Sequence, residues 1–406
     1  MIEVNFKSLA IKGSPMEQIT ELRQSAQHTD WSAVYVVGLT TFAVVTTEML
    51  PIGMMMPIAK ELDISLGTAG LIVSVPALLA AFFAPVVVLM AGEIDRRRIL
   101  VGLLMLLTVA NLASALSPSY EWLLVARVIV GFCMGGIWAV AGGLAPKLVP
   151  TQSIGVATAI IFGGVAAASV VGVPLGVLIS DIAEWRGAFA VMAGFSLMVF
   201  GLGFRLLPAL RVNQSVRASQ MIAELKRPRV QAGLFLTLLL VTGHFIAYTF
   251  VGSILEVISG VKTEWIGMLL FIYGSAGIIG NFLAGRFAST RLGMTLGTII
   301  FSLLIAIPSF AFVGEGTISA AEILILWGGA YGGVSVALQI WMMKAASTSI
   351  EITTALFVSV FNSAIALGAL IGGQVTDRFG LHITLTVAAI FAALALSFLL
   401  LILRRN

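Results

Sequence analysis

The stretch Thr46-Thr47-Glu48-Met49-Leu50-Pro51-Ile52-Gly53 places one carboxylate within an apolar run that extends over residues 33–59. A run of this length can cross a bilayer as a helix, which takes about 20 residues. An ionisable side chain in the hydrocarbon costs roughly 2.5 kcal/mol or more, so a functional role is its default interpretation. Of the nineteen Asp and Glu residues, Glu48 is the one that we place deep in a span. Glu48 is therefore the first candidate functional residue.

Pro51 follows Glu48 by about one turn and removes a backbone hydrogen bond from the expected helix. Broken helices are tolerated in a bilayer where they are buried in protein or line a cavity, so we expect a kink beside a cavity. Thr41 shares the helical face of Glu48 at a spacing of seven and is a candidate substrate contact. Glu48 has two interpretations, a proton carrier or a carboxylate that is permanently hydrogen-bonded to neighbouring helices.

The whole chain has the composition of a polytopic membrane protein. Hydrophobic residues make up 59% of it and charged residues 10%, whereas a typical soluble domain has about 25% charged residues. The predicted fold is an all-α membrane protein with twelve transmembrane helices. The expected spans are 33–58, 68–90, 99–117, 122–145, 154–179, 187–207, 230–254, 264–286, 294–313, 321–343, 353–375 and 382–403.

The distribution of Lys and Arg predicts the orientation in the membrane. With both termini in the cytoplasm, the cytoplasmic segments hold eighteen Lys and Arg residues and the outer segments hold four. Such a bias is typical of cytoplasmic loops. The net charge of +4 is thus explained by topology, and no nucleic-acid partner is expected.

A repeat divides the chain into two halves. Matching residues recur at a nearly constant offset, namely Gly131/Gly328, Gly135/Gly332, Gly136/Gly333 and Lys147/Lys344 at 197, and Gly172/Gly368, Gly176/Gly372 and Asp181/Asp377 at 196. Because charged residues take part, duplication explains the matches better than chance does. Two parallel six-span repeats are typical of a major facilitator transporter, with its site between the halves near the midplane. We expect a cytoplasmic arm over 1–30, pseudo-symmetric six-helix bundles over 31–207 and 230–406, and a cytoplasmic linker over 208–229.

Arg127, in the fourth span, is the second candidate for proton coupling. The rise of about 1.5 Å per residue puts its Cα only ~4 Å from Glu48 in depth. Intramembrane charges usually pair, so we predict that Arg127 pairs with Glu48, either in a proton cycle or as a fixed structural ion pair. Trp138 lies two to three turns inward on the face of Arg127 and is a candidate for stacking on a substrate ring.

In the second half, His244 and Tyr248 are spaced by four residues in the seventh span and could line a shared cavity. His244 is a candidate for substrate contact or proton relay, and the alternative is a packing residue. The repeat equivalent of Glu48, at an offset of 199, is the apolar Ala247. We therefore expect proton chemistry in the first half and substrate binding in the second.

A polar stripe on the tenth span consists of Tyr331, Ser335 and Gln339, spaced by four residues. We interpret these three as substrate contacts. The alternative is interhelical hydrogen bonding, which contributes about 0.6 kcal/mol per bond. Asn281 and Asn362 are interpreted as structural residues of this second kind.

The segment Asp95-Arg96-Arg97-Arg98 joins the second and third spans. It is either an anchor that follows the positive-inside rule or a latch, with Asp95 at a helix end and the arginines reaching across the interface of the halves. The stretch Gly172-Val173-Pro174-Leu175-Gly176 predicts close helix packing and a bend, because small residues let helices approach. Gly131, one turn after Arg127, is a further candidate gating or structural residue.

Several classes of protein are excluded. The sequence contains no His-Glu-x-x-His, Gly-x-Ser-x-Gly or Gly-x-x-x-x-Gly-Lys pattern, so we predict neither an enzyme nor a cofactor. The lack of a nucleotide-binding loop favours an ion gradient as the energy source. Cys133 is the single cysteine, which excludes disulfides and Cys-rich metal sites.

A set of motifs runs through the chain: Asp30-Trp31-Ser32-Ala33-Val34, Glu48-x-x-Pro51, Asp95-Arg96-Arg97, Arg127-x-x-x-Gly131, Gly172-x-Pro174-Leu175-Gly176 and Trp185-Arg186-x-x-Phe189. Together they resemble the drug:proton antiporter branch of the major facilitator superfamily, especially its bacterial sugar and purine-ribonucleoside efflux transporters. The resemblance implies export across the bacterial inner membrane. The family's loop motif has Gly where this chain has Ala91 and Arg98, and Ser289 stands where an Asp is common. These departures weaken the prediction of a latch.

We therefore predict a monomeric, proton-coupled antiporter that exports a small polar or amphiphilic solute, such as a sugar or a nucleoside. Its partners would be the substrate, protons and the lipid bilayer. A multidrug or antibiotic efflux pump of the same fold is the alternative, and a non-transporting membrane sensor or scaffold is a more distant one.

Overall fold

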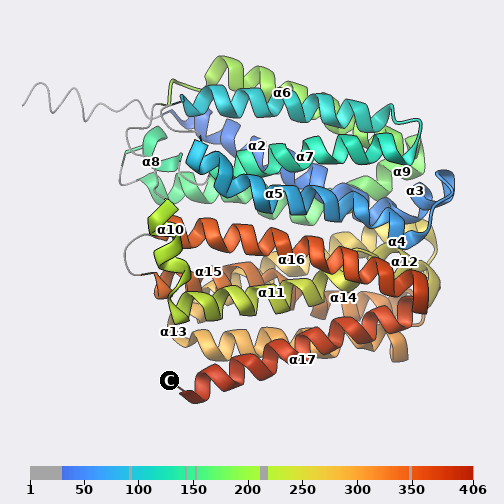
Figure 1. Ribbon diagram of the computed structural model, residues 1–406. Helices are drawn as coiled ribbons and strands as arrows, with labels where there is room; N and C mark the ends of the chain where they lie inside the picture. Colours follow the sequence, from blue (N-terminus) through green and yellow to red (C-terminus); the bar gives the residue numbers. More distant parts are fainter. Residues whose placement is uncertain are drawn as a thin grey trace, which may run out of the picture.

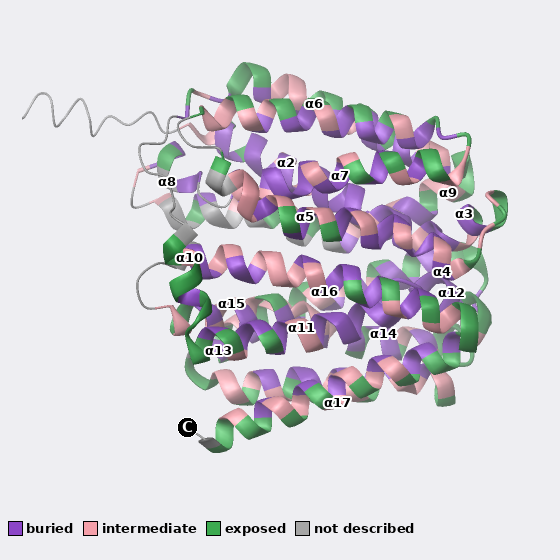
Figure 2. Ribbon diagram, viewed as in Figure 1, coloured by how far each residue is buried: buried purple, intermediate pink, exposed green. Residues whose placement is uncertain are grey.

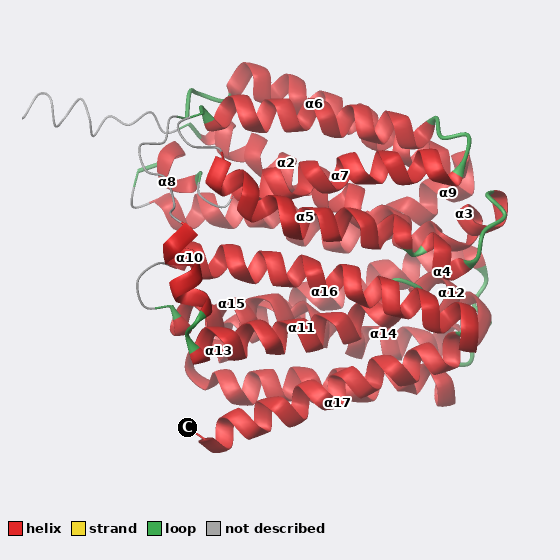
Figure 3. Cartoon of the chain, viewed as in Figure 1, coloured by secondary structure: helices red, strands yellow, loops and turns green. Residues whose placement is uncertain are grey.

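The computed structural model describes residues 30–90, 94–141, 144–150, 153–210, 218–346 and 350–405. These residues are almost entirely helical, and short connections join long helices that run side by side (Figures 1 and 3). The helices of the first half are α2 (Trp31–Met49), η1 (Leu50–Met54), α3 (Met55–Glu61), α4 (Leu66–Ala69), α5 (Leu71–Met90), α6 (Arg96–Ala115), α7 (Tyr120–Ala141), α8 (Ala145–Leu148) and α9 (Ile154–Leu206).

α10 (Ala218–Leu225) belongs to the linker, and the second half lies beside the first half (Figure 1). The helices of the second half are α11 (Pro228–Tyr248), α12 (Val251–Ser253), η3 (Ile254–Ile258), α13 (Thr263–Val313), α14 (Thr317–Gly332), α15 (Val334–Ala345), α16 (Ile350–Phe379) and α17 (Leu381–Arg405).

Two of these helices each contain two of the expected spans. α9 has non-helical backbone at Ala183 and Glu184, and α13 has it at Arg291. Eleven stretches of the described chain are long and apolar enough to cross a membrane, and one of them, Val170–Leu206, contains the α9 kink. The predicted all-α membrane fold of two six-helix bundles is confirmed.

The outer surface of the bundle is apolar. Large side chains such as Phe204, Phe282 and Phe312 are exposed, whereas buried residues concentrate between the helices (Figure 2). Patches of this kind on a soluble monomer would promote association, but they suit lipid contact. The surface therefore agrees with the span prediction.

Each half has its own buried core, and a few residues of the first half join the core of the second. Met134 and Trp185 lie in two first-half clusters, and Trp327 lies in a large second-half cluster. Ile52 and Val177 of the first half pack into that large cluster. The exact domain boundaries remain a prediction, and the arm over residues 1–29 and residues 211–217 of the linker lie outside the described chain.

The long helices run between two ends of the bundle (Figure 1). We call the end with α10 and the last turn of α17 the linker end, and the end with α3 and α4 the far end. The predicted orientation would put the linker end in the cytoplasm.

Candidate functional site

Glu48 lies at the last turn of α2, next to a break in the helix. α2 ends at Met49, and Leu50–Met54 continue as a 3₁₀ helix with Pro51 near its start, as the position of that proline predicts. The side chain of Glu48 is only 5% exposed, and its Oε1 has no hydrogen-bond partner among the described residues. A buried carboxylate oxygen without a partner is costly, which marks Glu48 as a functional candidate.

α9 packs closely against this break. A Cβ on Gly176 would lie 2.7 Å from the carbonyl oxygen of Leu50, and a Cβ on Gly172 would lie 3.5 Å from the Cα of Thr46. Pro174 is buried inside the same stretch of α9. The expected close approach is therefore present at Gly176, beside the break that follows Glu48, whereas the space at Gly172 would accept a Cβ.

Arg127 does not pair with Glu48 in this structure. Its Nη2 donates to Ser114 Oγ at 2.6 Å, and its Nη1 donates to the carbonyl oxygen of Thr47 at 3.3 Å. The guanidinium also lies over the ring of Phe189, 4.6 Å from the centroid. No ion pair joins Glu48 and Arg127 in the described chain, so the predicted pairing is wrong for this conformation.

Helical geometry explains the difference. Residues 47 and 48 follow each other at about 100° around α2. The expected depth was close enough for Arg127 to reach Thr47, whereas the side chain of Glu48 leaves the helix in a different direction and lies within electrostatic range of Tyr331 of the second half. The carboxylate is thus at the interface of the halves, whereas the guanidinium is inside the first half.

Asn111 in α6 is a polar residue of this site that the sequence analysis did not identify. Its Nδ2 donates to Thr47 Oγ1 at 3.1 Å and to Ser196 Oγ at 3.3 Å, and its side chain is fully buried. Thr47 is therefore held through its hydroxyl by α6 and through its carbonyl by α7.

Across the interface, four rings of the second half stack in the order Tyr331, His244, Tyr248 and Tyr273. The successive centroid distances are 3.3, 4.8 and 5.0 Å, with interplanar angles of 7°, 26° and 27°. We call these four rings the aromatic column. Tyr331 is its partly exposed end and the other three rings are buried.

Trp327 lies edge-on against the column and fixes the tautomer of His244. Its Nε1 donates to His244 Nδ1 at 3.1 Å. Indole N–H is only a donor, so Nδ1 accepts and the proton of neutral His244 is on Nε2. His244 Nε2 and Tyr273 Oη have no partner among the described residues. The column thus offers two unpaired polar groups beside flat rings.

A model of the Major Facilitator Superfamily matches residues 37–351. The chain belongs to this superfamily. The purine ribonucleoside efflux pump NepI of Salmonella typhimurium is 29% identical over 352 residues, which cover 87% of this chain and 89% of that protein. The transcription regulatory protein OpdE of Pseudomonas aeruginosa is 29% identical over 373 residues, 91% of this chain and 93% of that protein. The predicted resemblance is confirmed.

Solved structures show the same major facilitator fold. A bacterial homologue of the human lysosomal transporter Spinster, in an inward-facing and occupied conformation, has a TM-score of 0.73 at 14% identity and covers 97% of this chain and 98% of its own. A mutant of the nucleoside transporter NupG has a TM-score of 0.71 at 14% identity, with coverages of 92% and 98%. The protein is thus a major facilitator transporter of small molecules.

Other predicted substrate contacts of this Major Facilitator member lie outside the aromatic column. Thr41 is fully buried and its hydroxyl donates to the carbonyl oxygens of Gly38 and Ile161, which uses it in helix packing. Trp138 is half-buried against the first-half core. The role of these two residues in substrate contact remains a prediction.

The polar stripe of the tenth span is divided at Gly333, between α14 and α15. Tyr331 belongs to the column, Ser335 is exposed, and Gln339 donates through Nε2 to Thr354 Oγ1 at 2.8 Å. The three residues therefore have different surroundings. Their common role in substrate contact remains a prediction.

The two asparagines that were expected to bond between helices lie in different surroundings. Asn362 Nδ2 donates to the carbonyl oxygen of Val358 in its own helix. Asn281 is partly exposed on α13. The structural role assigned to the two asparagines remains a prediction.

The Asp95 segment holds the first half together at the linker end. Asp95 Oδ1 accepts from the backbone N–H groups of Arg97 at 2.9 Å and Leu210 at 2.8 Å, and caps α6 as expected. Arg97 Nη2 donates to the carbonyl oxygen of Phe204, and Arg96 donates its backbone N–H to Leu210 O. The prediction that Arg97 reaches across to the second half is wrong, because its partner is in α9. Ala91 lies outside the described residues.

Gly131 lies at a close contact between two helices. A Cβ there would lie 2.6 Å from the carbonyl oxygen of Pro76, so α7 approaches the backbone of α5 at this point. The turn of α7 below Arg127 is thereby fixed against α5.

Proposed function

We propose that this transporter is a proton-coupled antiporter that exports a nucleoside-like solute across the bacterial inner membrane, with both termini in the cytoplasm. The observation that carries the proposal is the buried Glu48 carboxylate, whose Oε1 is unpaired among the described residues and which lies within electrostatic range of Tyr331 in the second half. A group at that interface can be exposed to either side as the halves rock.

The aromatic column supports a substrate that has a flat ring and hydrogen-bonding groups. Stacking on an aromatic side chain contributes about 1–3 kcal/mol per base. Tyr331 is the partly exposed end of the column, and His244 Nε2–H is a donor without a partner. The likeness to a protein named as a purine ribonucleoside efflux pump supports the same class.

In the proposed cycle, Glu48 takes a proton while it faces outward and releases it after the carrier turns inward. Substrate binding then returns the carrier outward. One charge that moves down 100 mV yields about 2.3 kcal/mol, which sustains a roughly 50-fold gradient. Arg127, held in the first half, supplies a fixed positive field beside α2.

The test is substrate and proton flux in proteoliposomes that contain the full chain. Wild type is expected to release protons when purine ribonucleosides are added, and Glu48→Gln is expected to abolish this coupled flux. Glu264→Gln changes an exposed carboxylate, 67% exposed at the side chain, and serves as the matched control. Undiminished coupled flux in Glu48→Gln would exclude Glu48 as the proton carrier.

The substrate panel also separates the alternatives. Flux of lipophilic cations without flux of nucleosides would favour a multidrug pump. The relative OpdE is named as a transcription regulatory protein, which corresponds to the alternative of a membrane sensor. If the protein were a sensor, we would expect no substrate-dependent proton movement in wild type.

A further inference from the structure

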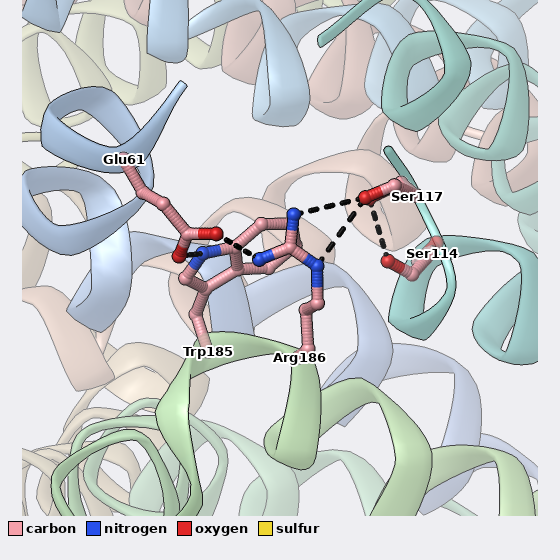
Figure 4. Close-up of polar contacts among 5 residues, drawn as sticks. All are labelled: Glu61, Ser114, Ser117, Trp185 and Arg186. Carbon is pink, nitrogen blue, oxygen red and sulfur yellow. Dashed lines mark hydrogen bonds and ion pairs between the residues drawn. The ribbon is translucent and has the colours of Figure 1, made fainter. Parts of the chain in front are cut away.

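A closed ring of contacts at the far end joins Glu61, at the end of α3, to Arg127. Figure 4 shows the part of the ring around Glu61, where side chains from α3, α6 and α9 meet. The ring runs through Glu61, Arg186, Ser117, Ser114, Arg127, Phe189 and Trp185 and returns to Glu61. Arg127 therefore has two connections to Glu61.

One connection is polar. Arg186 forms an ion pair with Glu61, and its Nε and Nη2 donate to the carbonyl oxygen of Ser117 at 3.3 and 3.0 Å. Ser117 Oγ donates to the carbonyl oxygen of Ser114 at 2.9 Å, and Ser114 Oγ accepts from Arg127. The guanidinium of Arg186 thus fixes the end of α6 relative to α3.

The other connection is aromatic. Trp185 Nε1 donates to Glu61 Oε2 at 2.6 Å, and its ring is 6.0 Å from that of Phe189, at 84°. Phe189 in turn lies beneath the guanidinium of Arg127. Trp185 and Phe189 are almost fully buried, so this connection is rigid.

The ring spans the helix break beside Glu48. Arg127 binds Thr47, which precedes the break at Leu50–Met54, and Glu61 follows it. Without these contacts, the 3₁₀ segment would let α3 move relative to α2, because breaks of this kind often mark hinges. With them, both sides of the break are attached to one group of helices.

We propose that Glu61, with Trp185 and Arg186, is a positioning residue that clamps α3 to the rest of the first half and so fixes Glu48 and Arg127 in relation to each other. The Glu61 side chain is 45% exposed, and its partners Arg186 and Trp185 are not members of the aromatic column, so we assign it to coupling and not to substrate contact. The role in coupling rests on the proposed function. The clamp itself does not.

The first test measures the clamp without transport. Spin labels at Lys60→Cys in α3 and Glu121→Cys in α7, in a Cys133→Ser background, report the distance between these helices. Glu61→Gln is expected to broaden the distance distribution. Arg186→Lys should do the same, since an ammonium lacks the forked donors that hold two partners. Glu264→Gln removes an exposed carboxylate at the same end and should leave the distribution narrow. An unchanged distribution in both ring variants would overturn the clamp.

The second test measures proton-coupled flux in proteoliposomes. A partly exposed ion pair contributes up to about 1 kcal/mol, so Glu61→Gln should lower coupled flux about fivefold, while substrate binding in detergent stays at the wild-type level. Weakened binding, or full coupling despite a broadened distribution, would overturn the positioning role. Absence of proton flux in wild type would reject the proposed function and not the clamp. The clamp would then be tested by the spin-label distances alone.

Discussion

The backbone N–H of Gly67 in α4 donates a hydrogen bond of 2.7 Å to Oδ1 of Asp377 in α16, so an acid of the second half caps a helix of the first. Ser65 Oγ donates to the other carboxylate oxygen at 2.5 Å. A Cβ on Gly67 would overlap the carbonyl of Gly373, so the two helices touch at backbone level. This contact closes the α4–α16 side of the far end.

Replacement of Asp377 by Asn should favour opening of the far end. Hydrogen bonds to a charged group contribute about 1.5–3 kcal/mol, so loss of the charge is expected to raise the open population about tenfold or more. The measurement is the rate at which a membrane-impermeant maleimide labels Ser253→Cys, a buried position between the halves. A tenfold faster rate is expected.

Asp181→Asn is the matched control, because Asp181 is the repeat counterpart of Asp377. It lines a small cavity of about 30 Å³ with Ser253 and Thr263, and no hydrogen bond to it is found among the described residues. Labelling should stay at the background rate. Equal acceleration by both variants would contradict a latch that is specific to Asp377.

Loss of the indole donor at Trp327 should weaken substrate binding. Trp327→Phe keeps a ring beside the column but removes the bond to His244 Nδ1, which then can carry the proton in place of Nε2. A typical hydrogen bond contributes about 0.5–1.5 kcal/mol, so the dissociation constant for the nucleoside should rise roughly three- to tenfold. Calorimetric titration in detergent would measure it. Trp265→Phe, at an exposed position of α13, is the control, and equal losses in both variants would reject the specific role of Trp327.

The contact between α13 and α14 should not tolerate a methyl group at Gly328. A Cβ there would overlap the carbonyl of Tyr273, a member of the column. Overpacking typically costs about 1–3 kcal/mol, so Gly328→Ala should lower the thermal unfolding midpoint and displace Tyr273. Gly297→Ala on α13, where a Cβ has open space, should not lower it. The comparison is made by thermal unfolding in detergent, and a stable Gly328→Ala would show that the helices can separate at no cost.

The fold could be predicted from the sequence because each span is a long apolar run, and the length of these runs is set by the thickness of the bilayer. The break after Glu48 could also be predicted, since Pro51 removes a local hydrogen bond. The partner of Arg127 was not predictable from the sequence. The depth of a residue in the membrane follows from its position along the helix, but the direction of its side chain depends on how α2 is rotated against α7.

The site in the second half was only partly predictable for the same reason. His244 and Tyr248 are four residues apart on one helix, so their adjacency follows from helical periodicity. Trp327 and Tyr273 come from other helices, and nothing in their local sequence indicates that they meet His244. Likewise, the repeat pairs Asp181 with Asp377, but only Asp377 caps a helix across the interface.

Arg127→Lys should lower coupled transport while the fold is kept. The guanidinium donates to Ser114 and Thr47 at once and lies flat over Phe189, and a compact ammonium cannot satisfy all three contacts. Loss of one charge-assisted bond, about 1.5–3 kcal/mol, predicts that coupled flux falls by about tenfold or more. Arg98→Lys, at an exposed position of α6, is the matched control and should transport like wild type. Wild-type coupling in Arg127→Lys would mean that the positive charge alone is sufficient, and that the contacts to Thr47, Ser114 and Phe189 are only structural.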